Sequence, residues 1–82
     1  MRIDKFLSTV NITKRRTVAQ DMLAHQVVYL NGVLAKPSKD VKVGDIIEIR
    51  YLDRIVRYEV LKIPQTKTLP KSAKSEYVRE LP

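Results

Sequence analysis

Three consecutive cations, Lys14, Arg15 and Arg16, carry the most informative chemistry in the sequence. They stand at the start of a helix-patterned segment, where the helix dipole disfavours exposed cations by roughly 0.3–1 kcal/mol each. Departures from such local rules concentrate at functional positions. A bound phosphate reverses the argument, because helix N–H groups and guanidinium groups then converge on one anion. The cluster therefore predicts a phosphate-binding site, and the alternative is a solvated surface patch.

Four further cations are expected to extend this surface. Lys36 and Lys39 lie in a polar connection after a predicted hairpin, which can bring them beside the start of the second helix. Arg2 and Lys5 belong to the first predicted helix. Asp4 lies in the first turn of that helix, where a carboxylate is favourable, and we expect it to orient Arg16 or Arg2 as a structural support.

Composition excludes several classes of function. The 82 residues carry a net charge of +7, which indicates a polyanionic partner because this charge repels itself in the folded state. With no cysteine and a single histidine, His25, the sequence predicts no disulfide, no metal site and no cofactor. No nucleophile–base motif or glycine-rich phosphate loop occurs, so no catalytic residues and no enzyme are predicted. No run approaches the roughly 18 apolar residues that cross a bilayer, and we expect a cytoplasmic protein.

Two short helices are predicted first. Ile3, Phe6, Leu7 and Val10 form one apolar stripe at helical spacing, and Asn11 is expected to end this helix. The second helix should start after Thr13, with Thr13 as its cap, and run to about His25.

Four short strands follow in the prediction. Apolar segments flank Asn31-Gly32, the dipeptide that favours a type I′ hairpin. Further strands are predicted over 46–51 and 55–63, where the cations alternate with Glu48 and Glu59 as on a mixed-charge solvent face. The fold class is α+β, with two short helices packed on a small twisted antiparallel sheet. Residues 1–63 form this domain, and residues 64–82 form a basic, proline-containing extended tail in which only Tyr77-Val78 docks on the body.

Four segments resemble the S4 RNA-binding domain, also called the αL RNA-binding motif. They are RIDKFL at 2–7, KRRTVA at 14–19, VYLNG at 28–32 and VKVGDI at 41–46. The resemblance covers about residues 1–51 and follows the order of the family. Gln26-Val27 replaces the glycine that the motif usually carries before the hairpin, so a different local turn is expected there.

The resemblance implies RNA binding along the face of the helix pair. Carried over by position, Arg2, Arg15, Arg16, Lys36 and Lys39 would contact ribosomal RNA and tRNA, and the charge pattern adds Lys5 and Lys14. Small free-standing members of the family imply a role on large ribosomal subunits that carry peptidyl-tRNA, together with an RqcH-like tailing factor. We expect a monomer without a membrane partner. Two alternatives stay open: a general ribosome-assembly or stress factor, and a basic protein at a membrane surface.

Overall fold

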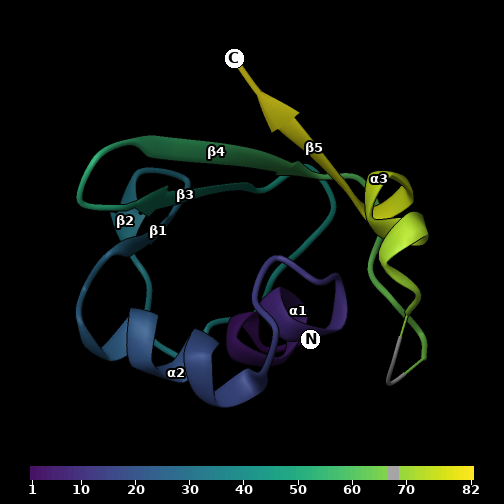
Figure 1. Ribbon diagram of the computed structural model, residues 1–82, viewed down its shortest axis with the longest axis horizontal. Helices are drawn as coiled ribbons and strands as arrows, with labels where there is room; N and C mark the ends of the chain where they lie inside the picture. Colours follow the sequence, from purple (N-terminus) through teal and green to yellow (C-terminus); the bar gives the residue numbers. More distant parts are fainter. Residues whose placement is uncertain (67–68) are drawn as a thin grey trace.

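Two helices cover one side of a five-stranded antiparallel sheet in the computed structural model, which describes residues 1–66 and 69–82 (Figure 1). Helix α1 is Ile3–Thr9 and α2 is Arg16–Ala24. The strands are β1 Val28–Leu30, β2 Val33–Leu34, β3 Ile46–Arg50, β4 Ile55–Val60 and β5 Val78–Leu81, in the order β2-β1-β3-β4-β5. The predicted α+β class is confirmed.

The first helix follows its apolar stripe. Ile3, Phe6, Leu7 and Val10 have no exposed surface, because all four face the sheet from one side of the helix. Asn11 has a φ of 65°, the left-handed conformation that was expected to end the helix.

The second helix begins at Arg16, later than predicted. The Thr13 hydroxyl donates to the Arg15 carbonyl at 3.1 Å, so it does not accept from the helix N–H groups. Arg15 occupies the cap position in an extended conformation without a side-chain cap. The prediction that Thr13 caps this helix is therefore wrong, and Lys14 and Arg15 precede the helix instead of forming its first turn.

The predicted hairpin is confirmed. Asn31 and Gly32 have φ values of 52° and 81°, as a type I′ turn requires. The Asn31 side chain also ties the turn to β3, since its oxygen accepts from the Ile46 N–H at 2.9 Å. Gln26, before the hairpin, has a φ of 62° and so takes up the backbone conformation that glycine adopts most readily.

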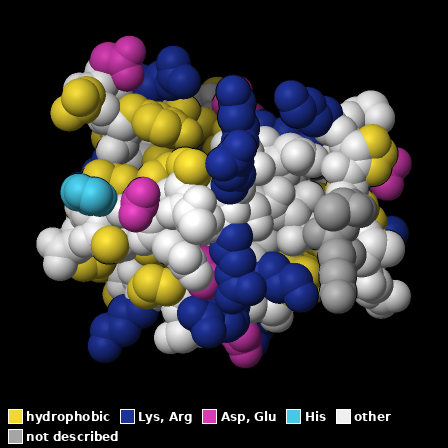
Figure 2. Space-filling model, turned by 60° about the horizontal axis from the view of Figure 1, so that its bottom comes forward, with side chains coloured by type: hydrophobic (Ala, Val, Ile, Leu, Met, Phe, Trp, Pro, Cys, Tyr) yellow, Lys and Arg dark blue, Asp and Glu magenta, His cyan; other side chains and the backbone are white. Residues whose placement is uncertain are grey.

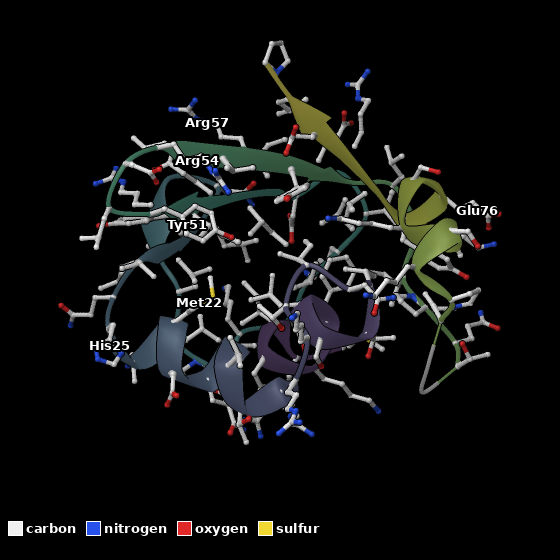
Figure 3. All side chains as sticks on the ribbon, in the orientation of Figure 1. Met22, His25, Tyr51, Arg54, Arg57 and Glu76 are labelled. Carbon is white, nitrogen blue, oxygen red and sulfur yellow. The ribbon has the colours of Figure 1, made fainter. Side chains whose placement is uncertain are left out.

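The core lies between the helices and the sheet. Phe6 and Leu7 from α1 meet Ile47 and Ile49 from β3, and none of these side chains is exposed. Met22 points from α2 toward the sheet in Figure 3 and packs against this core. The sheet thereby fixes the position of both helices.

The C-terminal segment differs from the predicted extended tail. Residues Lys71–Ala73 form a 3₁₀ turn, Lys74–Tyr77 form α3, and β5 pairs with β4, with Val78 opposite Val60. The expected docking of Tyr77-Val78 is confirmed, because Val78 is only 4% exposed and Tyr77 packs against the core. The tail prediction missed the strand because β5 obtains its stability from β4 rather than from its own composition. Residues 67–68 of the predicted tail lie outside the described residues.

Replacing Val78 tests whether this segment belongs to the folded unit. Val78→Ala should lower the free energy of unfolding by about 2 kcal/mol, because it leaves a cavity at a buried position. Urea denaturation measures the change. Val43→Ala is the matched control: Val43 is 64% exposed, and its loss should cost less than about 0.5 kcal/mol. Equal effects of the two variants would contradict a docked β5.

Candidate nucleic-acid interface

The three consecutive cations line one groove. Lys14, Arg15 and Arg16 lie where the end of α1 meets the start of α2, and all three are exposed. The groove measures about 300 Å³. It is completed by polar residues at and just after the end of α1 and by the C-terminal segment: Ser8, Thr9, Asn11 and Leu69. The structure thus gathers the predicted cluster on one surface.

Local hydrogen bonds shape this groove. The Thr13 hydroxyl fixes the backbone at Arg15, and the Asn11 amide donates to the Leu69 carbonyl at 3.0 Å. The second contact joins the end of α1 to a residue far along the chain. Within residues 1–66 and 69–82, neither Lys14 nor Arg15 forms an ion pair with a carboxylate. Two positive charges of the groove are therefore left for an external anion.

Asp4 is a buried carboxylate that binds two arginines, Arg2 and Arg16. Its side chain has no exposed surface, yet Arg2 donates to it at 3.1 Å and Arg16 at 3.3 Å. Gln20 donates at 3.2 Å and the Lys5 N–H at 2.8 Å. The expectation that Asp4 pairs with Arg16 or Arg2 is confirmed, and it pairs with both. About half of each arginine side chain stays exposed, so each guanidinium can also meet solvent or a ligand.

These donors determine the ionisation of Asp4. Burial by itself would raise the pKa of the carboxyl, but hydrogen bonds from Gln20 and the Lys5 N–H and the charges of Arg16 and Arg2 outweigh it. The net result is a pKa below the ordinary value of 3.8. Asp4 is therefore ionised at neutral pH and holds the two arginines as a charge pair.

The loop that carries Lys36 and Lys39 contacts α1, not the start of α2 as predicted. The Ile3 N–H donates to the Lys39 carbonyl at 2.7 Å, and the Asp4 N–H donates to the Pro37 carbonyl at 3.4 Å. These carbonyls satisfy the first N–H groups of α1, which no side chain caps. The side chains of Lys36 and Lys39 line a second, larger groove beside β2.

The cations form a band on the helix side of the molecule. Figure 2 brings the lower side of Figure 1 forward and shows Lys and Arg side chains running across the middle of this face. The loop with Lys36 and Lys39 contacts the start of α1, next to Arg2. Asp4 in turn pairs with both Arg2 and Arg16. The two groups of predicted cations are thus linked through Asp4. Lys5 contributes its backbone N–H to this centre, and its side chain is half-buried.

The opposite face carries mixed charges, as predicted. Arg57 points away from the helices in Figure 3 and pairs with Glu48 at 3.0 Å, and Arg50 pairs with the same carboxylate at 2.7 Å. Arg79 pairs with Glu59. In the part of the chain that the structure describes, no acidic or histidine side chains group into a metal site. Among the same residues, no helix has the length and apolar character needed to span a bilayer.

Some residues of the site were not predicted from the sequence. Gln20 lies four residues after Arg16 and so faces the same side of α2, a spacing that could have indicated a second donor to Asp4. Ser8 and Asn11 had no such signal, because only the packing of α1 against α2 brings them to the cations.

The lowered pKa of Asp4 gives a test of this centre. Asp4→Asn should lower the free energy of unfolding at pH 7 by about 1–3 kcal/mol, because the arginines lose their charged acceptor. Ionised Asp4 stabilises the fold above the unfolded-state pKa, and this stabilisation is lost as pH falls through the lower folded-state value. The gap between variant and parent should therefore close in acid.

Urea denaturation at pH 7 and at pH 3 measures the difference in unfolding free energy between Asp4→Asn and the parent. Asp53→Asn, at an exposed position in the β3–β4 turn, controls for the loss of one charge and should change stability by less than about 0.5 kcal/mol. A difference between Asp4→Asn and the parent that stays constant with pH would contradict the assigned role.

Comparisons with known proteins agree with this geometry. The family model described as the S4 domain matches residues 1–47. A Helicobacter pylori protein (strain J99) named RQC P-site tRNA stabilizing factor is 49% identical over 78 residues, which cover 95% of this chain and 93% of that protein. A Bacillus subtilis protein (strain 168) of the same name is 38% identical over 66 residues, covering 80% of this chain and 77% of that one.

Two solved structures share the fold. Heat shock protein 15 of Vibrio cholerae superposes with a TM-score of 0.88 at 30% identity, over 99% of this chain and 81% of that chain. The solution structure of the hypothetical protein HP1423 gives a TM-score of 0.86 at 45% identity, over 100% of this chain and 98% of that one. Sequence and structure together place the molecule in a known group: the chain belongs to the S4-domain family, alongside the RQC P-site tRNA stabilizing factors.

Proposed function

We propose that this chain is a non-catalytic RNA-binding protein that acts in ribosome-associated quality control and stabilises tRNA in the P site of the large ribosomal subunit. One observation carries the proposal: three adjacent cations line a groove at the amino end of α2, and two of them have no carboxylate partner among the described residues. The relatives named as P-site tRNA stabilizing factors support the same role.

The cations bind phosphate in two different ways. Arg16 is held by Asp4, so its planar guanidinium is presented in a fixed orientation and loses little freedom on binding. Lys14 and Arg15 supply charge that is not paired with a carboxylate in residues 1–66 and 69–82. Folded RNA has a deep, narrow groove that side chains cannot read, so a compact basic surface binds it through phosphates and shape. Arg2, Lys5, Lys36 and Lys39 extend this contact to ribosomal RNA and tRNA in the proposed complex.

The proposed particle is a large subunit that still carries peptidyl-tRNA, in the cytoplasm. The chain acts there as a monomer, beside an RqcH-like tailing factor that extends the stalled peptide. Its own contribution is to hold the tRNA in place by neutralising the phosphates around it. If it neutralises about six phosphates, affinity should fall by roughly a thousandfold between 50 and 200 mM salt.

Removing one groove cation should weaken RNA binding without unfolding the domain. Arg16→Ala should cost about 1–3 kcal/mol of charge-assisted contact with RNA. The fold should persist because Arg2, Gln20 and the Lys5 N–H still serve Asp4. Filter binding to ribosomal RNA gives the affinity and circular dichroism gives the stability. Arg79→Ala removes an equal charge from the sheet, where Arg79 pairs with Glu59, and should leave RNA affinity within about twofold. A collapse of the fold in Arg16→Ala would mean that Arg16 has a purely structural role.

Sedimentation of the tagged protein tests which ribosomal particle it binds. We expect it to migrate with large subunits that carry peptidyl-tRNA and to bind vacant large subunits more weakly, because the tRNA adds phosphates to the site. Equal binding to vacant subunits would favour an assembly or stress factor instead. Migration with small subunits, or free of ribosomes, would contradict the proposal, and flotation with anionic liposomes would favour the membrane-surface alternative.

A further inference from the structure

A second groove lies along the free edge of the sheet, beside the predicted RNA face. It measures about 820 Å³, within the range of small-molecule sites, and runs between β2 and the loop over 36–42. Val33 and Leu34 give it an apolar wall, and they are 69% and 41% exposed. Exposed apolar side chains at the edge of a small domain indicate a surface that another molecule can cover.

Lysines outnumber carboxylates in the charged lining of this groove. Lys36, Lys39 and Lys42 line it, and none of their ammonium groups forms an ion pair within the described part of the chain. Two carboxylates also line the groove, but both have donors of their own. Asp40 pairs with the amino-terminal ammonium group at 3.7 Å, and Asp45 accepts from the Lys42 N–H at 2.8 Å. The lysines are therefore available to a phosphate.

The backbone of Leu34 adds a hydrogen-bonding edge. Among the described residues, β2 pairs only with β1, and Leu30 is opposite Val33 next to the two-residue turn. In such a hairpin, bonded positions alternate, and the Ala35 N–H donates to the Val28 carbonyl. The N–H and the carbonyl of Leu34 therefore point away from β1, toward the open side. One N–H donor and one carbonyl acceptor on the same residue complement a base edge that presents an acceptor beside a donor.

We propose that this groove binds one unpaired nucleotide of the RNA. The base covers Val33 and Leu34 and meets the free backbone edge of Leu34, and the flanking phosphates meet the three lysines. A peptide strand is the competing occupant, because free sheet edges accept strands. The two-residue length of β2 offers too few backbone bonds for a strand, and the lysines favour a polyanion.

The site continues the RNA face, so the inference rests on the proposed function. The loop with Lys36 and Lys39 supplies the carbonyls at the start of α1, directly beside Arg2. A duplex bound across the helix face passes Arg2, and a base extruded at that point lies next to the groove. Ribosomal RNA offers such bases at bulges and loops, where unstacked bases are accessible to protein.

Two RNA hairpins with the same stem sequence test the proposal: one is fully paired, and the other carries a single inserted 2-aminopurine as a bulge. The parent protein should bind the bulged hairpin about tenfold more tightly because the base covers Val33 and Leu34, and the fluorescence of the 2-aminopurine should change as the base leaves water. Leu34→Ser should reduce this preference to within about twofold while leaving affinity for the paired hairpin unchanged. Leu52→Ser is the matched control, since Leu52 is fully exposed in the β3–β4 turn, and it should keep the preference.

The outcomes separate this inference from the proposed function. Equal affinity of the parent protein for both hairpins, or a preference that survives Leu34→Ser, would overturn the nucleotide site while the RNA-binding role stands. Failure to bind either hairpin at low salt would overturn the proposed function, and the nucleotide site with it. Loss of the preference in Leu52→Ser as well would show that the effect is not specific to this groove, and would also overturn the site.

Discussion

The buried carboxylate of Asp4 is the interaction on which the rest of the molecule depends. A charge without exposed surface is costly unless donors surround it, and here three side chains and one backbone N–H do so. Those donors come from α1, from the residue before α1, and from α2. Because the donors to this one carboxylate come from both helices, its hydrogen bonds fix the angle between the helices. The same bonds fix the positions of Arg2 and Arg16.

This arrangement explains how a small domain tolerates cations where a helix dipole opposes them. Arg16 stands at the first position of α2, and the negative charge of Asp4 offsets the repulsion from the helix end. Lys14 and Arg15 lie before the first residue of α2. The Thr13 hydroxyl donates to the Arg15 carbonyl and holds Arg15 in an extended conformation. The basic groove is therefore built at little cost to the fold.

The C-terminal segment contributes to both layers of the structure. β5 adds an edge strand to the sheet by pairing with β4. Leu69 borders the groove with Lys14, Arg15 and Arg16, and its carbonyl accepts from the Asn11 amide. Residues that a composition-based reading assigns to a loose tail thus support the core and border the interface. In contrast, Arg50, Arg57 and Arg79 on the sheet face away from the helices pair with Glu48 and Glu59, whereas Lys14 and Arg15 on the helix side form no ion pair among the described residues.

Local chemistry determined much of this molecule from sequence alone. The stripe of α1, the left-handed Asn11 and the Asn31-Gly32 turn follow from spacing and backbone preference, because each depends on neighbours along the chain. Charge narrowed the expected partners of Asp4 to Arg16 or Arg2. Tertiary packing alone decided that Asp4 pairs with both arginines and that the loop with Lys36 and Lys39 lies against α1. It also decided that β5 forms. These features depend on contacts between residues distant in sequence, whose free energy no single segment carries.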